Sequence, residues 1–163
     1  MRTGRAAIGS VVFFALAPGI VAGLLPWLLT GYQTAPLWAP LRAVGAGLIA
    51  AGSAVLVHAF ARFVVEGTGT PAPVAPTDRL VVGGLYRYVR NPMYVAVTAT
   101  ILGQALLLGR PVLLLEAALF VAATAAFVRW YEEPALLRRF GREYEAYRRA
   151  VPGWWPGRRP FSR

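Results

Sequence analysis

Two short segments carry most of the side chains that could take part in chemistry. The first, residues 85–97, reads LYRYVRNPMYVAV and leads directly into a long apolar run. An arginine can hold a carboxylate, and the face of a tyrosine ring can lie against a cation. We therefore expect this segment to bind a ligand that carries charged groups. Its polar and aromatic candidates are Tyr86, Tyr88, Arg90, Asn91 and Tyr94.

The second segment, residues 132–156, reads EEPALLRRFGREYEAYRRAVPGWWP and begins with two adjacent carboxylates. Glu132 or Glu133 could hold an ammonium group. Taken together, the two segments match a zwitterion that carries an additional positive centre. S-adenosylmethionine has this form, because it combines an amino acid, a sulfonium and an adenosine.

Other kinds of site find little support. The chain has no cysteine and one histidine, so it offers no thiol nucleophile, no disulfide and no Cys/His set for a metal. It also lacks a glycine-rich phosphate loop and the partners of a serine triad. The stretch GAGLIA at residues 45–50 matches the dinucleotide pattern G-x-G-x-x-G/A. It lies inside an apolar run with no strand before it, so we interpret it as helix packing.

Long apolar runs indicate what must position the two segments. Hydrophobic residues make up 57% of the 163 residues, and charged residues only 15%. Crossing a bilayer takes about 17–25 apolar residues, and helices satisfy their own backbone hydrogen bonds in lipid. We predict an all-α integral membrane helical bundle that forms a single domain over residues 1–163. About four transmembrane helices are expected, at residues 6–30, 41–65, 92–109 and 111–131.

After the last expected span the pattern becomes amphipathic. Apolar and aromatic residues recur at spacings of three and four from Leu136 to Val151, and the positions between them are mainly arginine and glutamate. We predict an amphipathic helix over about 133–151 that lies on the cytoplasmic face of the membrane. Trp154 and Trp155 would be its interfacial anchors.

Arginine placement predicts the orientation. All 17 basic residues are arginine, and the formal net charge is +10. With four spans, only Arg42 and Arg110 fall on the side opposite the termini. Because arginine excess marks the cytoplasmic face, both termini and the 66–90 loop are expected there, in a bacterial or archaeal inner membrane. This placement accounts for the basic charge through topology and anionic headgroups, without a nucleic-acid partner.

Several features within the apolar runs have more than one interpretation. Small residues between 45 and 53 predict close helix packing. His58, Arg62 and Glu66 share one helical face, either as an arginine reaching the interface beside a carboxylate or as the polar lining of a substrate cleft. Glu116 lies inside the last run, where a carboxylate is costly and often functional. Its position near the non-cytoplasmic surface favours a solvated residue.

The two segments resemble the signatures of a known family of membrane enzymes. GLYRYVRNPMYVAV looks like the signature G-x-Y-R-x-x-R-H-P-x-Y, and the segment that begins at Glu132 resembles E-E-x-x-L-x-x-x-F-G-x-x-Y-x-x-Y. Both occur in isoprenylcysteine carboxyl methyltransferases, which have the phospholipid N-methyltransferases as relatives. The resemblance covers about residues 84–156. The first two apolar runs match only in being hydrophobic.

The resemblance implies a membrane enzyme that takes a methyl group from S-adenosylmethionine. The cofactor would enter from the cytosol and a lipophilic acceptor from the bilayer. By position, the catalytic residues would be Arg90, Asn91 and Glu132. The residues that bind the cofactor would be Tyr86, Arg90, Asn91, Pro92, Tyr94, Glu132, Glu133, Arg142, Tyr144 and Tyr147.

Asn91 stands where the family usually has histidine, and Ala96 where glycine is frequent. An asparagine donates and accepts hydrogen bonds, but it cannot act as a general base near neutral pH. The departure puts any mechanism that needs imidazole in doubt, whereas methyl transfer itself does not require it.

Two rival functions stay open. A membrane reductase of the sterol type shares this helical layout but would use NADPH. A non-catalytic protein that binds lipid or a partner would use its arginines for headgroups and its tyrosines as an interface belt. The methyl acceptor is equally open, since a prenylated carboxylate, an amine headgroup and a small isoprenoid or fatty molecule all fit. The sequence does not determine the oligomeric state.

Overall fold

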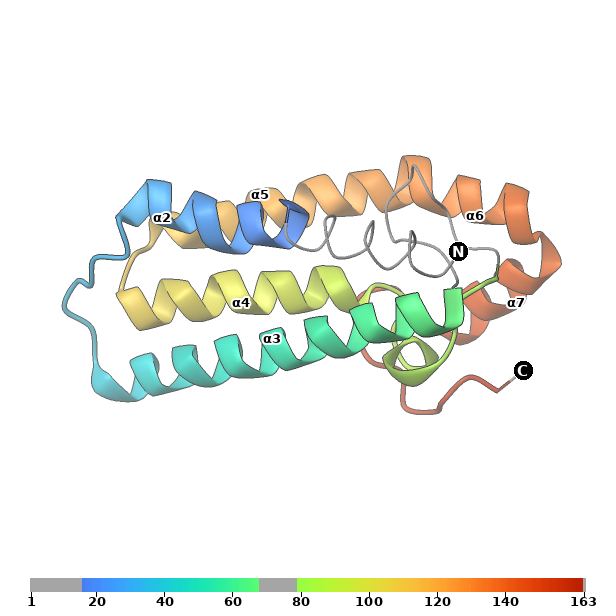
Figure 1. Cartoon of the computed structure of the whole chain (residues 1–163), viewed down its shortest axis with the longest axis horizontal. Helices are drawn as coiled ribbons and strands as arrows, with labels where there is room; N and C mark the ends of the chain where they lie inside the picture. The colour runs from blue at the N-terminus through green and yellow to red at the C-terminus, as the bar shows by residue number, and fades with distance from the viewer. Residues whose placement is uncertain (1–15, 68–78, 163) are drawn as a thin grey trace.

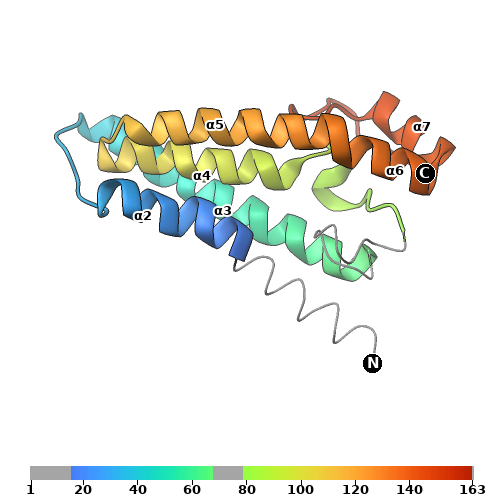
Figure 2. The same ribbon diagram turned by 90° about the horizontal axis from the view of Figure 1, so that it is seen from above.

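The structure is a computed structural model that describes residues 16–67 and 79–162, without the side chains at 63, 64, 66 and 67. Within these ranges every regular element is a helix, and the long helices run side by side (Figures 1 and 2). In chain order they are the π turn η1 (Ile20–Leu24), α2 (Leu25–Thr30), α3 (Ala39–Gly67), the 3-10 turn η2 (Gly84–Arg87), α4 (Pro92–Leu108), α5 (Val112–Phe127), the π turn η3 (Val128–Glu132), α6 (Glu133–Phe140) and α7 (Arg142–Ala150).

The predicted spans correspond to these helices. Two of them, Ala39–Arg62 and Val112–Phe140, are long and apolar enough to cross a membrane, and Leu16–Thr30 and Pro92–Leu108 are shorter apolar helices. Large apolar side chains point outward along the bundle, as at Leu119, which is 62% exposed. An apolar outer surface is what lipid contact requires, so the prediction of an all-helical membrane bundle is confirmed. The expected start of the first span, residues 6–15, lies outside the described residues.

Glycines set the close packing of α3 against α4. A Cβ added at Gly45 would lie 2.6 Å from the carbonyl oxygen of Gly103, and one added at Gly52 would lie 2.8 Å from that of Ala96. Such distances mean that the two backbones touch where side chains would otherwise stand. Gly47, by contrast, has nothing within 4 Å of an added Cβ. The packing role predicted for residues 45–53 therefore belongs to Gly45 and Gly52.

The boundaries expected at the end of the chain are wrong. No break separates a span ending at 131 from a helix beginning at 133, because α5, η3 and α6 form one continuous helix from Val112 to Phe140. Pro134 lies directly after the π turn η3, where the backbone already departs from the regular α-helical hydrogen-bond pattern. The break falls instead at Gly141, whose φ of 53° and ψ of −124° suit only glycine. The amphipathic helix predicted over 133–151 is thus two helices, α6 and α7.

The polar residues within the predicted spans lie in different environments. Glu116 is only 6% exposed, and neither carboxylate oxygen has a hydrogen-bond partner among the described residues. The expectation that Glu116 is solvated is therefore wrong. His58 and Arg62 are exposed and lie against the turn η2, since a Cβ on Gly84 would be 2.8 Å from Nε2 of His58. The side chain of Glu66, the third member of that predicted face, lies outside the described residues.

Candidate functional site

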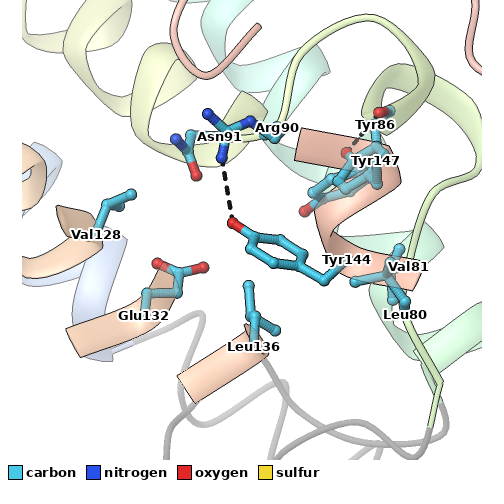
Figure 3. Close-up of a pocket in the computed structure, with 10 residues that line it drawn as sticks. All are labelled: Leu80, Val81, Tyr86, Arg90, Asn91, Val128, Glu132, Leu136, Tyr144 and Tyr147. Atoms are coloured by element: carbon cyan, nitrogen blue, oxygen red, sulfur yellow. Dashed lines mark hydrogen bonds between the residues drawn. The ribbon is translucent and has the colours of Figure 1, made fainter. Parts of the chain in front are cut away.

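A cavity of about 60 Å³ lies where the segment before α4 meets η3, α6 and α7 (Figure 3). Residues from both sequence motifs line it, together with apolar residues that the sequence did not single out. The predicted site residues that line it are Tyr86, Arg90, Asn91, Glu132, Tyr144 and Tyr147. The additional lining residues are Leu80, Val81, Val128 and Leu136.

Backbone hydrogen bonds from the C-terminal segment fix the first motif in place. The N–H of Arg90 donates to the carbonyl of Pro152 at 2.9 Å, and the N–H of Asn91 donates to that of Gly153 at 3.1 Å. Further along, the N–H of Gly157 donates to the carbonyl of Tyr88 at 2.7 Å. The chain after α7 therefore crosses back over residues 88–91 and satisfies backbone groups that precede the first turn of α4.

Arg90 connects the two motifs. Its Nη1 donates to Oε1 of Glu133 at 2.5 Å and to the hydroxyl of Tyr144 at 3.1 Å. Its Nε donates to the carbonyl of Val151 at 2.9 Å. Burial alone would lower the pKa of the Arg90 guanidinium, but the hydrogen bond to Glu133 and the proximity of Tyr144 outweigh it and raise the pKa. Arg90 thus stays charged and ties α6, α7 and the C-terminal segment to the start of α4.

The two adjacent glutamates point to different partners. Glu133 is buried and also accepts a hydrogen bond from Nη1 of Arg148 at 3.3 Å, so arginines contact both of its oxygens. Glu132 lines the cavity, and its Oε2 accepts a hydrogen bond from the hydroxyl of Tyr94 at 3.1 Å. Of the pair, Glu132 is the carboxylate that a molecule in the cavity can reach.

Asn91 lines the cavity, and its amide has an unused donor. The residue is 8% exposed, and its Nδ2 has no hydrogen-bond partner among the described residues. Figure 3 shows the Asn91 amide and the Glu132 carboxylate on facing sides of the cavity. Buried polar atoms without a partner are rare in folded proteins, and a catalytic role is one of the usual reasons.

Tyrosines form the wall next to α7. The hydroxyl of Tyr147 donates to the carbonyl of Tyr86 at 2.6 Å, which closes that side of the cavity. Burial raises the pKa of Tyr144 and of Tyr147 above the usual value for tyrosine. Both hydroxyls therefore remain protonated and act as hydrogen-bonding groups, not as bases, near neutral pH.

The other predicted site residues lie beside the cavity. Pro92 begins α4 and is buried, and Tyr94 reaches the cavity only through its bond to Glu132. Arg142 begins α7 and is exposed, so it does not join this group in the structure. Trp154 was expected to anchor the chain at the interface. It is only partly exposed and stacks on Tyr94 with ring centroids 6.3 Å apart.

Four apolar residues that line the cavity were not identified from the sequence. Leu80 and Val81 follow a proline- and glycine-rich stretch and gave no periodic signal before η2. Val128 and Leu136 lie on either side of Glu132 along the helix, at spacings that bring them to the same face as this carboxylate. That spacing could have identified them, had the helix been recognised as continuous.

Comparison with known proteins identifies the family. The phospholipid methyltransferase family matches residues 41–143, which is more than half of the 163 residues. The match includes α3, α4, α5 and α6 and therefore the first motif and the paired glutamates. No curated protein and no solved structure gives a significant match. With its helical membrane bundle and both motifs gathered at one cavity, the chain belongs to the phospholipid methyltransferase family.

Proposed function

We propose that this membrane methyltransferase uses S-adenosylmethionine and transfers the methyl group to a lipophilic acceptor. The observation that carries the proposal is the buried Asn91 amide, whose Nδ2 is unpaired among the described residues and which lines one cavity together with the Glu132 carboxylate. A hydrogen-bond donor and a carboxylate in one cavity suit the two charged ends of an amino acid. The family match supports methyl transfer, while the cofactor and the acceptor are our inference.

The chemistry of the lining residues fits the amino-acid end of the cofactor. Nδ2 of Asn91 would donate to its carboxylate, with the charge of Arg90 nearby, and Glu132 would accept from its ammonium group. Tyr144 and Leu136 would cover the less polar part. The cavity of about 60 Å³ is smaller than the whole cofactor, so we assign it to the amino-acid end alone.

When bound, S-adenosylmethionine supplies an electrophilic methyl group on a sulfonium, and it leaves as a neutral thioether after transfer. The work of the chain is then to hold the ligand, to orient it and to exclude water. Asn91 forms a hydrogen-bonding wall and takes no proton. Arg90 is held by Glu133 and Tyr144, so it contributes a fixed positive charge to the site.

The remaining expectations about organisation are also part of this proposal. We infer one domain over residues 1–163, with the cavity and both termini on the cytoplasmic side of a bacterial or archaeal inner membrane. Arg42 and Arg110, which the sequence assigns to the other side, bond to Leu107 and Gln33 near the opposite end of α4. This separation along the bundle supports the orientation inferred from the arginine count.

Equilibrium binding to the detergent-solubilised protein tests the cofactor. We expect S-adenosylmethionine to bind and NADPH not to bind. A reductase of the sterol type would give the reverse, and a non-catalytic lipid-binding protein would bind neither.

Substitution at Asn91 tests the site itself. Asn91→Leu should weaken binding by about 1–3 kcal/mol, because polar groups of the ligand then meet an apolar side chain. Asn91→His should keep most of the affinity, since imidazole offers a donor at a similar position. Unchanged affinity in Asn91→Leu would exclude the cavity as the cofactor site.

A further inference from the structure

A second cavity, about 90 Å³ in volume, lies on the other side of Tyr94 from the first. Four helices contribute to its walls: the N-terminal helix Leu16–Thr30, α3, α4 and α5. We call it the apolar cleft. The residues that matter for its properties are Val21, Leu56, Phe60, Tyr94, Val97 and Phe120.

The apolar cleft has no polar group to offer a ligand. Its lining side chains are all hydrocarbon or thioether apart from Tyr94, whose hydroxyl is turned away to Glu132. A buried water needs two to four polar partners and takes about 30 Å³. The cleft therefore has the volume for water but not the partners, and a hydrocarbon occupant is favoured.

Tyr94 is the wall between the two cavities. Its ring lines the apolar cleft and meets the edge of Phe120 with centroids 6.4 Å apart. Its hydroxyl donates to Oε2 of Glu132, which lines the first cavity. Trp154 stacks on the same tyrosine ring. A molecule whose chain fills the cleft would thus end beside Tyr94, next to the polar site.

We propose that the apolar cleft holds the hydrocarbon chain of the methyl acceptor and directs its reactive group toward Tyr94. This inference rests on the proposed function, because it assigns the second substrate of the same site. The cleft volume of about 90 Å³ is below the roughly 150 Å³ of an engineered cavity that binds benzene. A short stretch of one slim acyl or isoprenoid chain fits lengthwise, whereas a fused ring system such as a sterol does not.

Photolabelling in membranes tests the assignment. The protein is reconstituted into phosphatidylcholine vesicles that contain a phosphatidylethanolamine with a diazirine on one acyl chain, and labelled residues are mapped by mass spectrometry. We expect labelling at the cleft residues Val97 and Phe120. A diazirine-bearing cholesterol should label only the outer surface of the bundle.

Two variants fill the cleft from different walls. Val21→Trp places a larger side chain in the cleft from the N-terminal helix, where Val21 is partly buried, and Val97→Phe does so from α4. Either should lower acyl-chain labelling of Phe120 by about tenfold, as expected when two or more methylene groups lose a buried site. The control is Leu119→Trp, because Leu119 lies on the exposed face of α5 at 62% exposure and should leave the labelling of Phe120 unchanged. Retained S-adenosylmethionine binding confirms that each variant is folded.

The outcomes separate this inference from the proposed function. Loss of cleft labelling with retained cofactor binding supports the assignment. Equal labelling of Phe120 in wild type and both cleft variants overturns it, as does labelling confined to outward positions such as Leu119. If the acyl chain labels the cleft but the wild-type protein does not bind S-adenosylmethionine, the proposed cofactor is wrong and the cleft remains a lipid site.

Discussion

The adjacent glutamates should respond differently to the same substitution. Glu133→Gln removes the charge that faces Arg90 at 2.5 Å, in a pair whose side chains are 15% and 12% exposed. Glu132→Gln removes a charge at the cavity wall but keeps an oxygen that can accept from the hydroxyl of Tyr94. We therefore expect Glu133→Gln to lower stability and Glu132→Gln to lower cofactor affinity.

The contacts of the two glutamates determine how large each effect should be. Removing one partner of a buried ion pair costs about 3–5 kcal/mol, because the other charge is left uncompensated. Arg90 keeps its bonds to Tyr144 and to the carbonyl of Val151, so we expect about 2–3 kcal/mol. For a chain of this size that corresponds to a fall in Tm of about 4–12 °C. Loss of a charge-assisted contact in Glu132→Gln costs about 1.5–3 kcal/mol, or about tenfold to a hundredfold in Kd.

Thermal unfolding without ligand and calorimetric titration with S-adenosylmethionine, both in detergent, measure the two effects. Glu145→Gln is the matched control, because its pair with Arg149 has side chains 45% and 77% exposed. An exposed pair of this kind is worth less than about 1 kcal/mol, so both readouts should stay near wild type. The reasoning is refuted if Glu133→Gln melts like wild type, or if it weakens binding more than Glu132→Gln does.

Three further outcomes are expected. Gly52→Ala should destabilise the protein by about 1–3 kcal/mol in thermal melts, because the new Cβ would lie 2.8 Å from a carbonyl oxygen of α4. Gly47→Ala is the control, because there is open space around Gly47. It should be neutral or up to about 1 kcal/mol stabilising. Trp154→Ala should lower Tm and methyl transfer, because it removes the ring stacked on Tyr94. Trp155→Ala, at a position 79% exposed, should leave both near wild type. Reporter fusions should place the C-terminus in the cytoplasm and the loop between α2 and α3 outside, and an exported C-terminus would contradict the inferred orientation.

The sequence alone was sufficient for the helical membrane fold and for the family. Long apolar runs leave few alternatives, since backbone groups in lipid need partners within the same segment. Small residues in the second run predicted close packing, and the structure assigns it to Gly45 and Gly52. The two motifs, centred on Arg90 and Glu132, could be paired because a helical hairpin brings distant segments to one end of the bundle. The apolar runs, the small residues and the motifs are local or periodic features, so they can be recognised in the sequence without knowledge of the fold.

Tertiary structure decided what depended on side-chain direction and on contacts between distant segments. The sequence could not say which of Glu132 and Glu133 faces the cavity, because neighbouring residues on a helix differ in direction by about 100° and helix rotation is fixed only by packing. Likewise, Trp154 could be assigned to Tyr94 only once the chain after α7 had crossed back over residues 88–91. The apolar cleft has no sequence signature at all, because four helices build it from ordinary core residues and its shape depends on how those helices pack.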